Sequence, residues 1–258
     1  MKVSVLTVCF NSANTIARTL DSFFAQDWLN KEIIVIDGAS HDNTLEIARS
    51  YPQEQMRLLS EPDRGMYEAL NKALRLYSGD AFGVLNSDDC FHDVGVLSTI
   101  ACALEAADMV HGDLDFLDIG GRVVRRWQAE NKPAKGFRTG WMPAHPTFYV
   151  RREVADAVGE FDLTWQTASD YDWMLRAVEL HSFRLARLDR TMINMTIGGR
   201  STVSVAAHIG HNLEALRSRQ KWLGSGFVDY ALFAKPARKF RQFVGVGKQE
   251  EGLAPSMK

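Results

Sequence analysis

Short apolar runs alternate with segments of helical spacing along the first half of the chain. The runs are rich in β-branched residues, as in buried strands; they occupy Val3–Phe10, Glu32–Ile36, Met56–Leu59 and Ala81–Leu85, and Met109-Val110 opens another. Apolar spacings of three and four predict helices, at Ile16–Phe24 behind an Asn11-Ser12 cap, from about Asp42, at Met66–Leu76 and at Val94–Ala107. This alternation predicts an α/β fold with a Rossmann-like, mostly parallel central sheet flanked by helices.

The second half of the chain has a different pattern. Residues 113–150 mix short strands with Gly and Pro. Further along, we predict a loop at Gly159–Ser169, a short strand with a Gly-Gly turn at Thr191–Ser201, and helices at Arg152–Val158, Asp170–His181 and His208–Leu223. We expect one domain over residues 1–225, followed by a basic helical tail at 226–258.

The composition narrows the class of protein. The formal net charge is −2, so no global basic field indicates nucleic acid as a partner. None of the three cysteines forms a C-x-x-C pair, which favours neither a disulfide framework nor a zinc cluster. The apolar N-terminus fits a first strand better than a signal peptide, and no segment reaches the roughly 18–20 apolar residues of a membrane span. We expect a cytoplasmic protein, soluble or peripheral to a membrane.

Polar residues stand where the predicted strands end. Asn11 follows the first strand, Asp37 ends the second, and Asp88-Asp89 follows the fourth. Ligands of open α/β sheets bind at the carboxyl ends of the strands, so these residues indicate one site. Asp37 suits a ribose hydroxyl or base N–H, although Asp-Gly is also a strong turn signal. Phe10 suits either stacking on a base or packing in the core.

Two groups of carboxylates are candidates for chemistry. The adjacent Asp88 and Asp89 concentrate negative charge that Mg²⁺ or Mn²⁺ would offset, and the alternative is a capping pair at a turn. Asp170 and Asp172 begin a predicted helix that Ser169 can cap; acids suit a helix N-terminus, and one of them can also act as general base on a hydroxyl. Asp63, in the loop before Met66–Leu76, faces either a nucleotide or solvent.

Taken in order, the motifs are more specific than any one of them. SVLTVCFNSANTIARTLDSFFAQ, EIIVIDGASHDNT, EPDRGMYEALNKAL, LNSDD and GEFDLTWQTASDYDWMLR follow one another along the chain. Over roughly residues 3–200 the sequence resembles family 2 glycosyltransferases, which have the GT-A fold. The resemblance implies a nucleotide-sugar-binding half at 1–112, an acceptor-binding half at 113–225, and a divalent metal cofactor, Mg²⁺ or Mn²⁺.

The resemblance also implies roles for individual residues. Asp37 matches the aspartate that contacts the nucleotide base, and the nucleotide-sugar set is Phe10, Asn11, Asp37, Asp63, Asn71 and Asp88. The LNSDD segment matches the D-x-D metal motif with Asn86 at its first acidic position, which leaves either Asp88 or Asp89 as the direct ligand. Asp170 matches the general base of an E-D pair whose glutamate is replaced by Ser169. His145 and the Gly198-Gly199 turn fall on the acceptor side, and Asp172 is expected to support the start of its helix.

The expected reaction is an inverting transfer of a sugar, with a UDP-sugar favoured as donor, to a hydroxyl of a lipid-linked or cell-surface glycan in bacteria. One alternative is a nucleotide-binding module with impaired catalysis, which the Asn86 and Ser169 departures keep open. Another is a sugar nucleotidyltransferase, but NSANTIART lacks the glycine-rich phosphate loop. The basic stretch 235–248, with Phe240 and Phe243, either contacts the inner face of a membrane or packs as a helix.

Overall fold

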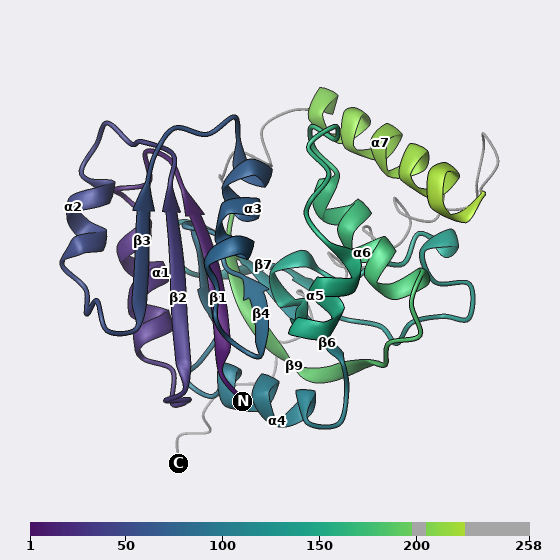
Figure 1. Ribbon diagram of the computed structural model, residues 1–258, viewed down its shortest axis with the longest axis horizontal. Coiled ribbons are helices and arrows are strands. Elements are labelled where there is room, and N and C mark those ends of the chain that lie inside the picture. Colours follow the sequence, from purple (N-terminus) through teal and green to yellow (C-terminus); the bar gives the residue numbers. More distant parts are fainter. Residues whose placement is uncertain (198–204, 225–258) are drawn as a thin grey trace, which may run out of the picture.

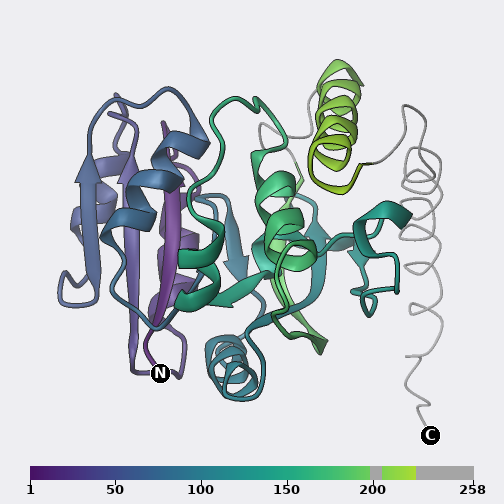
Figure 2. The same ribbon diagram turned by 45° about the vertical axis from the view of Figure 1, so that its right-hand side comes forward.

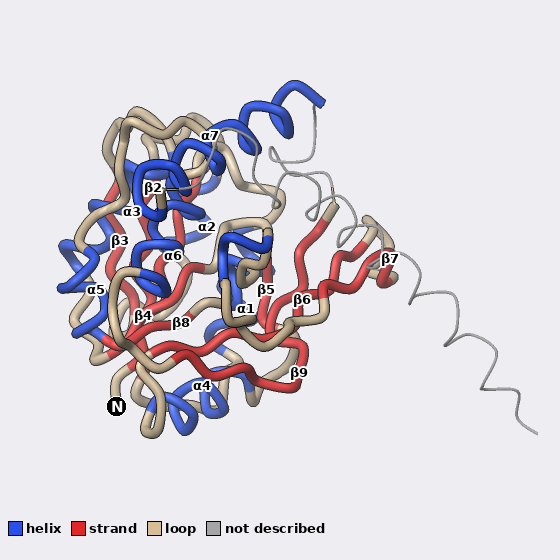
Figure 3. The backbone as a smooth tube through the Cα atoms, turned by 90° about the vertical axis from the view of Figure 1, so that its right-hand side faces the viewer, coloured by secondary structure: helices blue, strands red, loops and turns tan. Residues whose placement is uncertain are grey.

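The structure is a computed structural model in which residues 1–197 and 205–224 are described. Their strands form one nine-stranded sheet with the order β3-β2-β1-β4-β8-β6-β9-β5, and β7 pairs with β6 outside this path. Figure 3 shows these strands crossing the molecule between layers of helix. The predicted tail and its membrane contact at 235–248, like the Gly198-Gly199 turn, lie outside the described residues.

The N-terminal part of the sheet is parallel, as the alternation of strands and helices predicts. Its strands are β3 (Met56–Ser60), β2 (Lys31–Asp37), β1 (Val3–Cys9) and β4 (Ala81–Val84). The remaining strands, β8 (Tyr149–Arg151), β6 (Met109–Leu117), β9 (Leu185–Thr196), β5 (Asp89–Phe91) and β7 (Val123–Trp127), pair antiparallel except for β6 with β9. The parallel strands bring their carboxyl ends to one edge, where the candidate residues gather.

Helices cover both faces of the sheet (Figure 1). One face carries α1 (Ile16–Phe24), α2 (Thr44–Arg49) and α4 (Val96–Leu104); the other carries α3 (Met66–Leu76), α5 (Arg152–Val158) and α6 (Ser169–Glu179). Strand β2 is buried by helices on both faces: Ile33 and Val35 pack in one core, and Ile34 and Ile36 pack in the other. A strand buried on both faces has the continuous apolar run seen in the sequence.

The last described helix, α7 (Val205–Leu223), lies against α6 at the edge of the molecule, as Figures 1 and 2 show from two directions. Short 3₁₀ turns, η1 (Gly136–Thr139) and η2 (His145–Thr147), occupy the region where the sequence mixes Gly and Pro. No helix within residues 1–197 and 205–224 combines the length and apolar character that crossing a membrane requires.

Three local predictions were wrong. Helix α1 spans Ile16–Phe24 as predicted, but its N-cap is Thr15 and not Asn11-Ser12, and the Asn11 amide oxygen accepts the His41 N–H instead. The segment after β4 is more than a turn, since Asp89–Phe91 pairs with the far end of β9. Strand β9 begins at Leu185, where short-range polarity hides its pairing with β6.

The buried carboxylate of Glu32, near the start of β2, should make the stability of the fold depend on pH. Glu32 is 4% exposed and accepts hydrogen bonds from Lys2 Nζ at 2.7 Å and Ser4 Oγ at 2.6 Å. Burial opposes its ionisation, but these bonds and those from Ser78 outweigh it and lower its pKa to about 2. A carboxylate with a lowered folded-state pKa stabilises the fold above its unfolded pKa and loses that contribution as the pH falls through the folded value.

We therefore expect Glu32 to contribute on the order of 3 kcal/mol at neutral pH, lost between about pH 5 and pH 2. Glu32→Gln should lower the free energy of unfolding at pH 7, measured by urea titration, and flatten its decline toward pH 3. Glu54→Gln, at an exposed position, is the control. An equal pH dependence in wild type and Glu32→Gln would contradict this assignment.

Candidate active site

Asp37 organises the loop at the end of β2. Its carboxylate is fully buried and accepts hydrogen bonds from the Ser40 N–H at 3.1 Å and from Ser60 Oγ at 2.7 Å, as well as from the Ser40 hydroxyl. The loop is joined to β1, since Ser40 Oγ accepts the Asn11 N–H at 2.8 Å. Asn11 has a φ of 51°, a left-handed conformation that asparagine tolerates better than most residues. The buried Asp37 carboxylate therefore holds the loop after β2 in place. Its predicted contact with a nucleotide base stays a prediction.

Phe10 and Asp63 both lie beside Gly38. Phe10 is 40% exposed, and its ring lies edge-on to His41 with centroids 6.4 Å apart. A Cβ on Gly38 would lie 2.7 Å from Asp63 Oδ2 and 3.4 Å from the Phe10 ring, so both side chains approach the backbone closely at this glycine. An exposed aromatic ring beside a carboxylate at the strand ends is an arrangement suited to a nucleoside.

The LNSDD segment lies beside the same loop, because Ser12 Oγ and Ser87 Oγ are 3.0 Å apart. Asp89 is fully buried; its Oδ2 accepts the Asn86 amide at 3.1 Å, and its Oδ1 and the Asn86 Oδ1 are both buried without a hydrogen-bond partner. Burial raises the pKa of the Asp89 carboxyl, and the charge of Asp88 raises it further. Burial also raises the pKa of the partly exposed Asp88.

These residues fit a divalent cation. The pKa values of the two adjacent carboxyls are raised, and the buried Oδ1 atoms of Asn86 and Asp89 have no hydrogen-bond partner. Oxygen ligands of this kind are the ones that hard divalent cations prefer. Within residues 1–197 and 205–224, no cluster of three His, Cys, Asp or Glu side chains forms a complete site. A cation here would therefore take its other ligands from substrate phosphates and water.

Arg18 links this motif to β9. Its guanidinium donates to the Asp88 carbonyl oxygen at 2.6 Å and also to the Thr196 hydroxyl. Since Arg18 lies on α1 and Thr196 ends β9, three distant segments meet at the motif. Arg18 is the nearby positive charge that opposes the rise in the pKa of Asp88 and Asp89, although burial prevails in both.

Asp170 lies at the start of α6, between α3 and η2. Its Oδ1 accepts the Tyr67 hydroxyl at 3.1 Å, and its Oδ2 lies 3.8 Å from His145 Nδ1, too far for a hydrogen bond. Burial, more than the opposing charge of Asp170, lowers the pKa of His145, so its ring is neutral at pH 7. Burial and the Asp170 charge raise the pKa of Tyr67, which therefore stays protonated. Among the described residues nothing donates a hydrogen bond to Asp170 Oδ2, and the side chain is 19% exposed.

The two parts of the site are joined through α3. Asp63 accepts the Gly65 N–H at 2.9 Å in the loop that starts α3, and Tyr67 follows in the first turn of that helix. One short segment therefore places Asp63 beside the β1–β2 edge and Tyr67 on Asp170. The arrangement combines an exposed aromatic ring at the strand ends, a carboxylate pair and an accessible carboxylate held by a tyrosine.

Residues 4–159 match the family described as Glycosyl transferase family 2. The chain belongs to this glycosyltransferase family. It is 25% identical over 179 residues to a PGL/p-HBAD biosynthesis glycosyltransferase of Mycobacterium bovis, a match covering 67% of this chain and 68% of the relative. It is 26% identical over 198 residues to the uncharacterized glycosyltransferase YwdF of Bacillus subtilis, covering 73% and 71% of the two chains.

Solved structures confirm the GT-A fold. S. aureus TarS 1–349, in complex with UDP-GlcNAc, matches with a TM-score of 0.69 and 20% identity over 93% of this chain and 73% of that one. The mannosyltransferase PcManGT of Pyrobaculum calidifontis, in complex with GDP-Man and Mn²⁺, gives 0.66 and 18% over 98% and 76%. Against a longer TarS chain the glycosyltransferase spans 44% of the length. The family match ends at residue 159, so the assignment of Asp170 depends on its geometry.

Asn71, Ser169 and Asp172 make structural contacts in the glycosyltransferase, as was expected of Asp172 alone. Asn71 is 2% exposed, and its amide exchanges hydrogen bonds with the Phe161 backbone at 2.9 and 2.8 Å, which ties α3 to the loop before α6. Ser169 is not the helix cap: it is the first residue of α6, fully buried, and donates to the Asp162 carbonyl at 2.8 Å. Asp172 is also fully buried and bonds to α7. We do not carry these three into the proposed site.

Sequence reasoning missed Tyr67, Arg18 and the serines that surround Asp37. Tyr67 lies in a helix that was predicted only from its apolar spacing, and an aromatic residue in such a pattern is expected to pack in the hydrophobic core. Its position directly after the EPDRG loop was the available signal. Arg18 faces solvent on an amphipathic helix, and nothing in its neighbourhood along the chain indicates the approach of Thr196.

Proposed function

We propose that this glycosyltransferase moves a sugar from a nucleoside-diphosphate sugar to an acceptor hydroxyl with inversion, and that Asp170 is the general base. The observation that carries this is the asymmetry of the Asp170 carboxylate, where Tyr67 holds Oδ1 while Oδ2 is left to accept a proton. A neutral His145 does not neutralise that carboxylate. One attack on the anomeric carbon, with proton transfer to Asp170, inverts its configuration.

The proposed binding site for the donor consists of Phe10, Gly38 and Asp63 together with the LNSDD motif. We place the nucleoside against Phe10 and the diphosphate beside Asp88. Asp88 would hold Mg²⁺ or Mn²⁺, which would supply the positive charge that offsets the charge growing on the departing diphosphate. A UDP-sugar is the favoured donor, because TarS, a structural neighbour, is solved with UDP-GlcNAc, while PcManGT provides the GDP-linked alternative.

The acceptor proposed is a hydroxyl of a lipid-linked or cell-surface glycan. The comparison that bears on the acceptor is with a mycobacterial relative named as a PGL/p-HBAD biosynthesis glycosyltransferase. His145, beside Asp170 and 6.3 Å from the Phe161 ring, lies on the acceptor side of the base in this proposal. Retention through a second carboxylate is disfavoured, because Asp172 is buried under α7 and holds Ser218 and Trp222.

Thermal shift with UDP-, GDP- and dTDP-linked sugars, with and without Mn²⁺, tests the donor. One donor at about 100 times its Kd should add about 2.7 kcal/mol and raise the Tm by roughly 5–10 °C, in a metal-dependent way. The same donor should release nucleoside diphosphate when metal and an acceptor are present. Binding without release would favour a module with impaired catalysis, and no shift with any donor would contradict the proposed nucleotide-sugar site.

A further inference from the structure

The N-terminus of α6 is not capped by its own sequence. The residue at the N-cap is Ala168, and no side chain of the preceding loop bonds to the first turn there. The first N–H groups of a helix have no partner within the helix, and other groups must satisfy them. Tyr67 approaches this end of α6 from one side, because its hydroxyl donates to the Asp170 carboxylate at 3.1 Å.

Glu214, on α7, binds the loop that leads directly into this helix. Its Oε1 accepts the Gln166 N–H at 3.0 Å, and its Oε2 accepts the Thr167 N–H at 2.8 Å, the Thr167 hydroxyl at 2.9 Å and the Ala168 N–H at 3.0 Å. One carboxylate thus fixes three consecutive peptide units directly before α6. Burial opposes ionisation of Glu214, but these donors outweigh it and lower its pKa.

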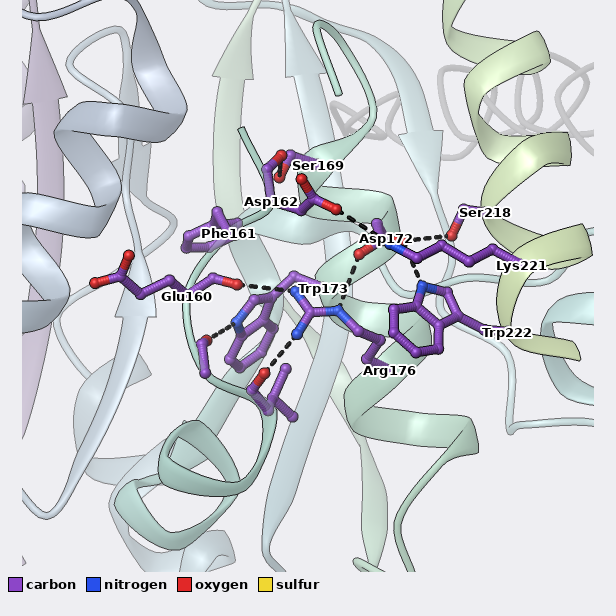
Figure 4. Close-up of polar contacts among 12 residues, drawn as sticks. Glu160, Phe161, Asp162, Ser169, Asp172, Trp173, Arg176, Ser218, Lys221 and Trp222 are labelled. Atoms are coloured by element: carbon purple, nitrogen blue, oxygen red, sulfur yellow. Dashed lines mark hydrogen bonds and ion pairs between the residues drawn. The ribbon is translucent and has the colours of Figure 1, made fainter. Parts of the chain in front are cut away.

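A second group of contacts fixes the same helix one turn later (Figure 4). Asp172 accepts Ser218 Oγ and Trp222 Nε1 from α7, each at 2.8 Å, and Arg176 Nε at 2.9 Å. Arg176 donates in turn to the Glu160 carbonyl at 2.9 Å. Asp170 therefore lies between two anchors to α7, with Ala168 on one side and Asp172 on the other.

We propose that Glu214 is a positioning residue, and that α7 acts through it to hold the Asp170 carboxylate in its reactive orientation. This rests on the proposed role of Asp170 as general base. The peptide units bound by Glu214 end two residues before Asp170, and the helix that begins there transmits their position. A displacement of about 1 Å at a reacting group can cost about 100-fold in rate.

Glu214→Ala and Glu214→Gln separate positioning from folding. Glutamine keeps one acceptor oxygen for the three donors at Oε2 and loses the bond to Gln166, so its effect should be intermediate. We expect Glu214→Ala to lower kcat about 10- to 100-fold while the donor KM stays within about 2-fold. Hydrogen exchange of a peptide covering 163–170 should become faster in both variants, more so in alanine.

Two control variants and Asp170→Asn distinguish a loss of positioning from a loss of stability and from a wrong assignment of the base. Leu104→Ala, in the buried face of α4, lowers the Tm without touching α6, and Arg217→Ala changes an exposed position of α7; neither should change kcat. An unchanged kcat in Glu214→Ala, or a loss matched by Leu104→Ala at equal Tm, would overturn the positioning role. If Asp170→Asn kept normal turnover, the base assignment would fail, and exchange at 163–170 would still report on the Glu214 anchor.

Discussion

Asp170→Asn should lower kcat about 1,000-fold, because asparagine cannot take a proton from the attacking hydroxyl, and a general base typically supplies 10²- to 10⁴-fold. The amide oxygen of asparagine can still accept the Tyr67 hydroxyl, so the start of α6 should keep its place. Donor affinity should not change, since Asp170 is proposed to act on the acceptor. Product formation at saturating donor and the donor Kd by calorimetry are the two measurements.

Asp172→Asn is the matched control for this result, since it makes the same chemical change two residues later. Asp172 is buried and holds Arg176, Ser218 and Trp222, so removing its charge leaves Arg176 without its ionic partner. We expect a lower Tm with a smaller loss of kcat. Equal kcat in wild type and Asp170→Asn would place the base elsewhere, and equal loss of kcat in both variants would mean that the charge of α6 matters more than proton transfer.

The sequence predicted the parallel half of the fold because the relevant signals are local there. Apolar runs buried on both faces, such as β2, are visible without knowledge of any partner strand. The residues that end these strands are brought together by the topology alone, which is why Asn11, Asp37 and the LNSDD segment were predicted at one edge. The hydrogen bonds from Asn11 to the loop after Asp37, and the approach of Ser12 to Ser87, agree with that expectation.

The rest of the site depends on contacts that periodicity does not encode. Asp170 meets Tyr67 across 103 positions of sequence, and Asn71 meets Phe161 across 90. Asn71 was predicted to bind the nucleotide-sugar, but its amide is buried against the Phe161 backbone. Glu214 has a residue type common on exposed helix faces, but its carboxylate binds the backbone of another segment. Both differences arise because a side chain of α3 or α7 binds backbone groups of the loop before α6, at Phe161 and at residues 166–168.

Asp88→Asn should abolish the Mn²⁺-dependent part of donor binding and lower turnover by about 100-fold, equivalent to about 2.7 kcal/mol of metal-assisted stabilisation. We propose Asp88 as the direct ligand because it is partly exposed beside the diphosphate position, whereas Asp89 is fully buried and bonded to Asn86. The measurement is thermal shift with the nucleotide-sugar and Mn²⁺, together with turnover.

Asp89→Asn discriminates between the two carboxylates through an effect of opposite sign. Burial and the charge of Asp88 raise the pKa of Asp89, so its ionised form destabilises the metal-free protein above its unfolded pKa, and this cost disappears as the pH falls. Removing that charge should therefore raise the Tm of the metal-free protein at pH 7, whereas Asp88→Asn should change it less. If Asp88→Asn kept the full Mn²⁺-dependent shift and Asp89→Asn lost it, Asp89 would be the direct ligand, and donor binding would have to expose it.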